Sequence, residues 1–178
     1  MTTLSAGVIL LSGPIGAGKT TVAAEIVRQT ASSLIYIEGD KFWSYIAKPH
    51  PNEEQNKRLY LIMRAMTAAA TPFVRGGYSV LIDFSFPPDF LKVVMAQRRK
   101  SGVAEPLHYI VLRPSIEVCA ARAKNREDGK IDDYTAYQDF YKQFIYDDEK
   151  TLGGDGMDPA AVAEEIIQGV KTGRFVVS

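Results

Sequence analysis

The sequence predicts a three-layer α/β/α fold, in which helices cover both faces of a mainly parallel sheet of about four to five strands. Three observations indicate this class. Short apolar runs alternate with longer segments of helical periodicity, the runs are rich in Val, Ile, Leu and Tyr, and they are apolar enough to be buried on both faces. The chain has 178 residues, the length of one domain with a substantial core. We therefore expect a single domain over residues 1–178.

Four apolar runs are predicted to form the strands of this sheet. They are VILLS (8–12), LIYIE (34–38), YSVLIDF (78–84) and LHYIVL (107–112). Their composition favours central positions in a parallel sheet. A fifth strand is doubtful, because the segment KTLGGDGM, which separates the last two predicted helices, is too polar and glycine-rich for a core strand.

Segments with helical periodicity alternate with these runs. Pro88 and Ser115 stand at positions that helix starts favour, and Gly102 follows a lysine-containing last turn as a stop signal. The charged stretch after the fourth helix is expected to form a small lid at about 124–134. The predicted helices cover residues 20–31, 53–74, 88–102, 115–127, 134–149 and 159–171.

Composition and charge argue against several classes of function. Lys plus Arg and Asp plus Glu both number 21, so no overall field attracts nucleic acid or an anionic membrane. The longest apolar runs are far shorter than the roughly 20 residues that span a bilayer, and the N-terminus MTTLSAG has no secretion-signal pattern. The single cysteine, Cys119, cannot form an internal disulfide. We expect a cytoplasmic protein that does not enter membranes, and its oligomeric state stays open.

Residues 13–20, GPIGAGKT, match the phosphate-binding pattern G-x-x-x-x-G-K-[ST] between a predicted strand and a predicted helix. In this setting backbone N–H groups and a helix N-terminus converge on phosphate oxygens. Lys19 is expected to reach the β- and γ-phosphates and Thr20 to ligate Mg²⁺, so ATP and Mg²⁺ are the expected cofactors. The alternative is a glycine turn with a solvated lysine. The predicted nucleotide-binding residues are Gly13, Pro14, Ile15, Gly16, Ala17, Gly18, Lys19, Thr20 and Thr21.

Two aspartates follow predicted strands, at the sheet edge where ligands bind in open α/β sheets. We assign Asp40 to the acceptor hydroxyl, which it would orient and deprotonate, and Asp83 to Mg²⁺ or its waters. Alternatively, Asp40 caps the short helix that follows it, and Asp83 is a polar strand end bonded to neighbouring backbone. Glu38 is a weaker candidate for the metal because it lies within a strand.

Arg122 and Arg126 are four residues apart on a predicted helix, so they share a face and are expected to grip one polyphosphate. The loop after them is expected to close over the nucleotide and exclude water. The alternative is a solvated, charged helix end. On the acceptor side, Trp43, Arg64 and Phe84 are weaker candidates for contact with the acceptor, since such residues also serve packing or surface roles.

These features resemble P-loop kinases of the nucleoside monophosphate kinase-like group, which includes gluconate and shikimate kinases, chloramphenicol phosphotransferase-like enzymes and polynucleotide 5′-hydroxyl kinases. The resemblance rests on GPIGAGKT, EGDKFW, VRGGYSVLID and LRPSIEVCAARAKNRE. It implies the P-loop NTPase fold, MgATP as donor, an acceptor-side base at Asp40 and lid arginines at Arg122 and Arg126. The chain lacks the G-G-G and D-x-D patterns of shikimate kinases. Shikimate is therefore not supported.

We expect an ATP-dependent phosphotransferase that moves the γ-phosphoryl group of MgATP to a hydroxyl of a small molecule. One alternative is a polynucleotide 5′-hydroxyl kinase, which the balanced charge disfavours without excluding it. Another is a nucleotide-dependent binding module or switch without an acceptor. The sequence leaves open the identity of the acceptor and the choice between ATP and GTP.

Overall fold

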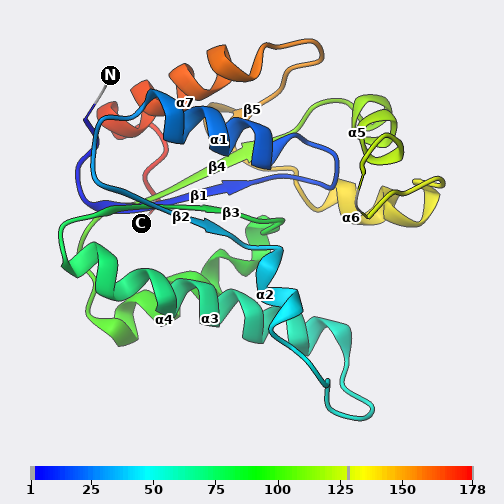
Figure 1. Cartoon of the computed structure of the whole chain (residues 1–178), viewed down its shortest axis with the longest axis horizontal. Helices are drawn as coiled ribbons and strands as arrows, with labels where there is room; N and C mark the ends of the chain where they lie inside the picture. The colour runs from blue at the N-terminus through cyan, green and yellow to red at the C-terminus, as the bar shows by residue number, and fades with distance from the viewer. Residues whose placement is uncertain (1–2, 128, 178) are drawn as a thin grey trace.

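A five-stranded parallel sheet lies between two layers of helices in the computed structural model, which describes residues 3–127 and 129–177 (Figure 1). The strand order is β2-β3-β1-β4-β5. The four ladders that join neighbouring strands are all parallel. The strands are β1 (Gly7–Ser12), β2 (Leu34–Glu38), β3 (Ser79–Asp83), β4 (Leu107–Leu112) and β5 (Thr151–Leu152).

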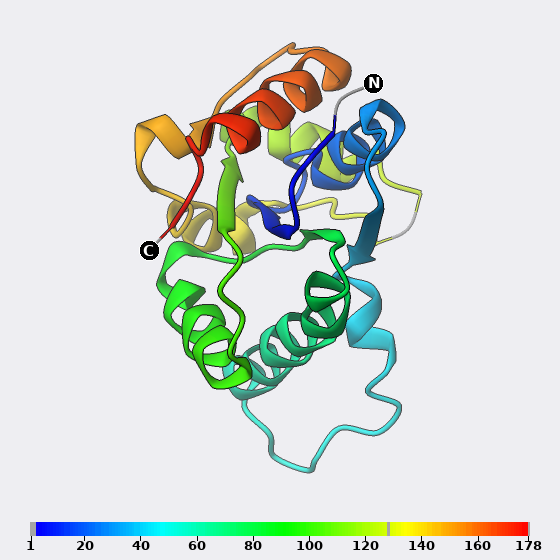
Figure 2. The same cartoon turned by 90° about the vertical axis from the view of Figure 1, so that its left-hand side faces the viewer.

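Helices cover both faces of the sheet, as the three-layer prediction requires (Figure 2). On one face α1 packs against α7, and on the other α3 packs against α4. The short helix α2 follows β2, while α5 and α6 lie beyond the carboxyl ends of the strands. The helices are α1 (Lys19–Gln29), α2 (Lys41–Ser44), α3 (Gln55–Arg75), α4 (Leu91–Ser101), α5 (Ile116–Lys124), α6 (Gln138–Lys142) and α7 (Pro159–Thr172).

The core has one half on each side of the sheet because successive strand residues point to opposite faces. In β1, Ile9 and Leu11 belong to the apolar cluster under α1 and α7. Val8 and Leu10 belong to the cluster against α3 and α4. All four side chains are at most 2% exposed, which explains why the strands read as continuous apolar runs.

The doubt about a fifth strand was wrong. Thr151 and Leu152 form β5 and pair with Val111 and Leu112 of β4. The strand is two residues long, and Leu152 is buried in the core under α1 and α7. Two residues are too few to show a hydrophobic periodicity, so the sequence of the strand alone does not predict it. Its pairing depends on the segments that pack around it.

The predicted helix over 134–149 is also wrong. The structure has a 3₁₀ turn at Thr135–Tyr137, the short α6, and a second 3₁₀ turn at Asp148–Lys150. Its aromatic residues do not share one face: Tyr141 packs into the cluster under α1 and α7, and Phe144 into the opposite cluster. A single straight helix cannot serve both sides of the sheet.

Helix boundaries elsewhere follow the predicted signals. The Ser115 hydroxyl accepts a hydrogen bond from Val118 N and caps α5, and α4 ends at Gly102 in the left-handed conformation. Pro88 begins a 3₁₀ turn (Pro88–Phe90) that leads into α4. Within the described ranges, no helix combines the length and the apolar character needed to cross a bilayer.

The topology brings three chemically important segments to one edge of the sheet. In a parallel sheet the carboxyl ends of all strands lie at the same edge. Because β3 lies between β2 and β1, the residues that follow these three strands become neighbours. These residues are the glycine loop after β1, Asp40 after β2 and Asp83 at the end of β3.

Candidate functional site

The glycine loop between β1 and α1 packs too closely against other backbone to carry side chains at two positions. A Cβ on Gly16 would overlap the carbonyl oxygen of Cys119 in α5, and one on Gly13 would overlap that of Leu112 in β4. Both glycines also have positive φ angles, 81° and 147°, which residues with side chains rarely adopt. The loop conformation therefore requires glycine at both places.

Side chains from α1, from α5 and from the loop before Thr135 hold the carbonyl oxygens of this glycine loop. Lys19 Nζ donates hydrogen bonds to Gly13 O at 3.1 Å and Pro14 O at 3.0 Å. Arg122 Nη1 donates to Ala17 O at 3.2 Å. The Tyr134 hydroxyl donates to Ile15 O at 2.7 Å. The loop is thus fixed before any ligand binds, which is the preorganisation that an anion site needs.

Tyr134 was missed by the sequence analysis as a residue of this site. It lies at the end of the predicted lid segment and is 8% exposed. Its distance in sequence from Ile15 is 119 residues, so no local motif signals the contact.

A cavity of about 530 Å³ opens beside the loop and brings the predicted residues together. It also includes Ser85 and Ile131, which the sequence did not single out. The two arginines and Lys19 give it more positive than negative groups, which suits a polyphosphate. Its predicted residues are Ile15, Gly16, Gly18, Lys19, Thr20, Thr21, Asp40, Asp83, Phe84, Arg122 and Arg126.

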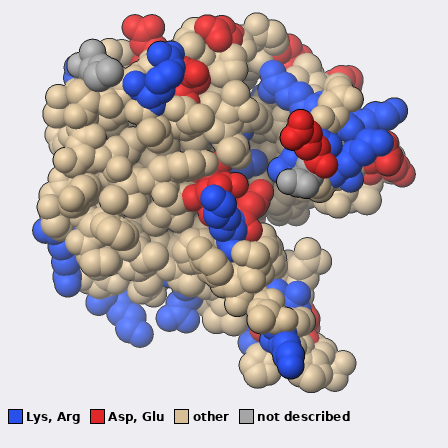
Figure 3. Space-filling view, in the orientation of Figure 1, with Lys and Arg blue, Asp and Glu red and all other residues tan. Residues whose placement is uncertain are grey.

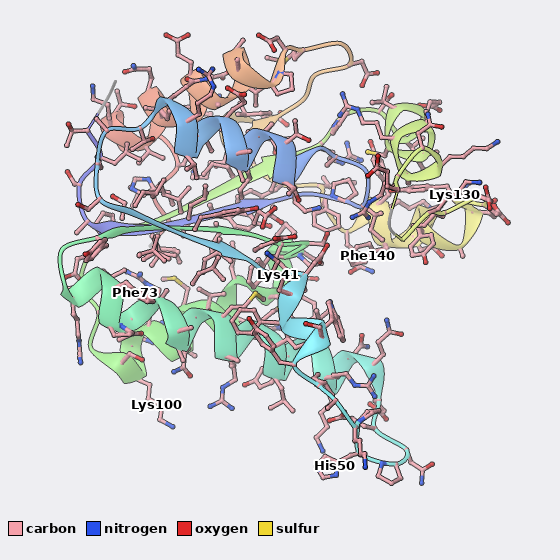
Figure 4. The ribbon with its side chains drawn as sticks, in the orientation of Figure 1. Lys41, His50, Phe73, Lys100, Lys130 and Phe140 are labelled. Carbon is pink, nitrogen blue, oxygen red and sulfur yellow. The ribbon has the colours of Figure 1, made fainter. Side chains whose placement is uncertain are left out.

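The opening of this cavity lies on the right of the molecule in the view of Figure 3, where Lys and Arg side chains gather on the upper side of a hollow. Figure 4 places Lys130, on the predicted lid, above this opening and Lys41 of α2 below it. Ile131 N donates to Ala123 O at 3.1 Å, which ties the lid segment to α5. Closure of the lid stays a prediction.

The Thr20 and Asp83 side chains form the part of the site that suits a divalent cation. Thr20 Oγ1 donates a hydrogen bond of 2.8 Å to Asp83 Oδ2. The hydroxyl proton is therefore engaged, and the lone pairs of the hydroxyl oxygen stay available to a cation. Asp83 Oδ1 is buried without a hydrogen-bond partner in the described part of the chain. Hydroxyl and carboxylate oxygens are the ligands that Mg²⁺ prefers. The donor set therefore fits Mg²⁺.

Burial raises the pKa of the Asp83 carboxyl, and the hydrogen bond from Thr20 and the charge of Lys19 oppose this rise. A cation next to the carboxylate would favour the charged form further. The carboxylate bonds the Thr20 side chain, whereas the alternative interpretation expected bonds to neighbouring backbone.

The Asp40 carboxylate lines the cavity and does not cap a helix. Asp40 occupies the N-terminal position of α2, but its side chain makes no capping hydrogen bond there. The preceding residue, Gly39, is held against β3 because its N–H donates to Asp83 O at 2.9 Å. An exposed carboxylate is thereby kept next to the loop and to Asp83.

A second cavity of about 170 Å³ adjoins the first on the side of β5. It shares Gly18, Thr21 and Arg122 with the larger cavity. Most of its wall is apolar and comes from segments that the sequence analysis did not connect with a ligand. These wall residues are Ala17, Val22, Leu112, Pro114, Leu152, Gly153, Gly154, Met157, Pro159 and Val162.

Of the three acceptor candidates, the structure brings only Phe84 to the larger cavity. Phe84 is 3% exposed and lines its floor. Trp43 is not among the described lining residues, since it packs against the core cluster next to α3. Arg64 is not among them either, and its guanidinium lies 5.7 Å from the centre of the Tyr60 ring.

Comparison with known proteins agrees with this geometry. Residues 8–139 match the AAA domain family, and this is more than two thirds of the chain. The chain belongs to the AAA domain family. No curated protein matches it at the level of sequence.

Solved structures show the fold of this AAA domain protein to be that of P-loop kinases. The tunicamycin resistance protein of Deinococcus radiodurans has a TM-score of 0.71 and 17% identity, with 97% of this chain and 99% of that chain covered. A sugar kinase from Janibacter sp. has a TM-score of 0.68 and 20% identity, with 92% of this chain and 94% of that chain covered. The APS kinase of Mycobacterium tuberculosis was solved with AMPPNP and APS. It has a TM-score of 0.69 and 14% identity, with 94% of this chain and 99% of that chain covered. The predicted P-loop NTPase fold is confirmed.

The electrostatics of the loop in this AAA domain protein depend on Lys19. Burial lowers the pKa of its ammonium group to about 8, against the opposing charges of Asp40 and Asp83. Because this value lies below the ordinary 10.5, the unfolded chain binds more protons than the folded one between pH 8 and 10.5. The free energy of unfolding of the ligand-free protein should therefore rise with pH in this window.

We expect ATP binding at pH 8 to take up about half a proton per site, because the phosphates restore the charge of a lysine that is about half protonated there. Uptake should be smaller at pH 7, where Lys19 is already charged. Calorimetry in two buffers with different ionisation enthalpies measures it. Lys19→Ala should remove the uptake and Lys100→Ala, far from the cavity (Figure 4), should not. Equal uptake in Lys19→Ala would show that another group titrates.

Proposed function

We propose that the protein is an ATP-dependent kinase that transfers the γ-phosphoryl group of MgATP to an alcohol hydroxyl of a small molecule. One observation carries the proposal. A single cavity holds the phosphate-binding loop with Lys19, the Thr20–Asp83 pair, and the exposed, non-capping carboxylate of Asp40. The loop and the pair suit nucleotide binding alone. The carboxylate of Asp40 adds the group that an acceptor hydroxyl requires.

The two cavities suggest how the donor binds. The phosphates would lie on the loop, with Lys19 between the β- and γ-phosphates. The apolar cavity next to β5 would take the base, because it shares Gly18, Thr21 and Arg122 with the phosphate side. Thr20 and Asp83 would hold Mg²⁺ directly or through its waters, and the cation would neutralise charge on the phosphates.

The remaining side chains support transfer to a hydroxyl. Asp40 would accept a hydrogen bond from the acceptor hydroxyl and align its oxygen with the γ-phosphorus. Arg122 and Arg126 would stabilise the charge on the group in transfer. Phe84 and Ser85, which line the same cavity, would form the acceptor wall. The segment around Ile131 would exclude water from this space, which limits hydrolysis of ATP.

An acceptor screen tests the proposal. The protein is incubated with MgATP and with sugars, nucleosides, antibiotics or 5′-hydroxyl oligonucleotides in separate wells, and ADP release is compared with the rate without acceptor. We expect at least one small molecule to raise the rate and to carry the labelled γ-phosphate. A response to oligonucleotides alone would indicate a polynucleotide kinase. Tight nucleotide binding with no response in any well would indicate a switch.

A further inference from the structure

Tyr36 in β2 has a buried hydroxyl that packing alone does not explain. Its Oη and Asp83 Oδ1 are both buried, and neither has a hydrogen-bond partner of normal geometry in the described part of the chain. Buried polar atoms in native proteins are nearly always paired, so each of these two atoms calls for a reason. A phenylalanine would fill the same space without this penalty.

The strand register places Tyr36 and Asp83 diagonally across the β2–β3 ladder. Tyr36 is the partner of Leu81, and Glu38 is the partner of Asp83. Tyr36 and Leu81 pack in the same cluster, on the face that carries α1 and Thr20. A long side chain at this position can reach a diagonal neighbour. Burial, followed by the nearby Asp83 carboxylate, raises the pKa of the Tyr36 hydroxyl, which agrees with this proximity.

Only one of the two carboxylate oxygens of Asp83 is held by a hydrogen bond among the described residues. Thr20 Oγ1 donates a hydrogen bond of 2.8 Å to Oδ2, while Oδ1 has no donor among the residues that the structure describes. A carboxylate held at one oxygen can still rotate about its Cβ–Cγ bond. The Thr20 side chain, which is hydrogen-bonded to it, then changes its orientation as well. A second donor at Oδ1 would fix the carboxylate plane and, through it, the hydroxyl that faces the cation.

We infer that Tyr36 is a positioning residue of the metal part of the site, whose hydroxyl donates a hydrogen bond to Asp83 Oδ1 when Thr20 and Asp83 hold Mg²⁺ with the nucleotide. The inference rests on the proposed function. Tyr36 touches neither nucleotide nor acceptor in this arrangement, and it acts through Asp83.

Tyr36→Phe tests the inference because it removes the hydroxyl and keeps the ring. Binding of a fluorescent ATP analogue is titrated with Mg²⁺, which needs no acceptor and no turnover. We expect the Mg²⁺ concentration for half-maximal binding to rise about tenfold, which is the scale typical of lost hydrogen-bond partners of metal ligands. Binding of the analogue in EDTA should stay within about twofold of the wild type, because the loop and Lys19 are unchanged.

Tyr109→Phe is the matched control. Tyr109 also has a buried hydroxyl, but it donates to Phe86 O on the opposite side of the sheet. Losing this bond should lower the melting temperature and leave the Mg²⁺ midpoint unchanged. A double variant adds a second test: in an Asp83→Asn background, Tyr36→Phe should shift the Mg²⁺ midpoint by less than about twofold, because Tyr36 acts through that carboxylate.

Each outcome decides the matter. An unchanged Mg²⁺ midpoint in Tyr36→Phe overturns the inference. A loss of analogue affinity in EDTA as large as the loss with Mg²⁺ also overturns it, and so does a variant that does not fold. Either result would show that the hydroxyl serves the stability of the fold. If the wild type itself binds the analogue without any dependence on Mg²⁺, the proposed function fails together with the inference.

Discussion

Lys19→Ala should lower phosphoryl transfer by orders of magnitude and leave the fold intact. The variant removes the point charge expected between the β- and γ-phosphates, and loss of one such group typically lowers turnover by about 10²–10³-fold. It also removes the two hydrogen bonds that tie Lys19 Nζ to Gly13 O and Pro14 O, so the loop loses part of its preorganisation. The core is not affected, because the apolar clusters contain no part of this side chain.

Thermal unfolding with and without MgATP measures this effect, together with ADP release. The wild type should be stabilised by MgATP according to its affinity and concentration. In Lys19→Ala this stabilisation should be lost, while the melting temperature without ligand stays close to that of the wild type. Lys100→Ala, at the far end of α4, serves as the control for loss of a lysine (Figure 4). Undiminished stabilisation and turnover in Lys19→Ala would place the nucleotide elsewhere.

The sequence sufficed to predict those parts of the site that follow from local rules. The glycine loop is a contiguous motif with a defined position between a strand and a helix, and both are present. Asp40 and Asp83 were predicted because parallel strands all end at one edge of the sheet. The structure brings both to the cavity beside the loop, together with Arg122 and Arg126.

The features that were missed depend on contacts between distant segments. Tyr134 reaches the carbonyl oxygen of Ile15 across 119 residues. The apolar cavity is closed by the two-residue β5 and by Met157, neither of which has a periodic pattern. Trp43 follows Asp40 by three residues, but α2 turns its ring toward the core next to α3. Sequence proximity fixed the place of its backbone and not the direction of its side chain.

Asp40→Asn and Asp83→Asn should have different effects, because the two carboxylates differ in their surroundings. Asp40 is exposed and makes no capping bond, so its substitution should leave stability and nucleotide affinity unchanged. The amide cannot take the acceptor proton, and transfer should fall by about 10²–10⁴-fold. Asp83 is 3% exposed and holds Thr20, so its substitution should act on the cation.

A Mg²⁺ titration of both variants separates the two roles. In Asp83→Asn the Mg²⁺ concentration for half-maximal nucleotide binding should rise about tenfold or more, since the amide has no charge to attract the cation. In Asp40→Asn this midpoint should equal that of the wild type, although the maximal rate of transfer is low. If no acceptor is yet known, the same comparison uses binding of a fluorescent ATP analogue for the midpoint. Should both variants shift the midpoint alike, Asp40 belongs to the metal site, and the group that activates the acceptor hydroxyl has to be sought near Ser85 and Arg126, which line the same cavity.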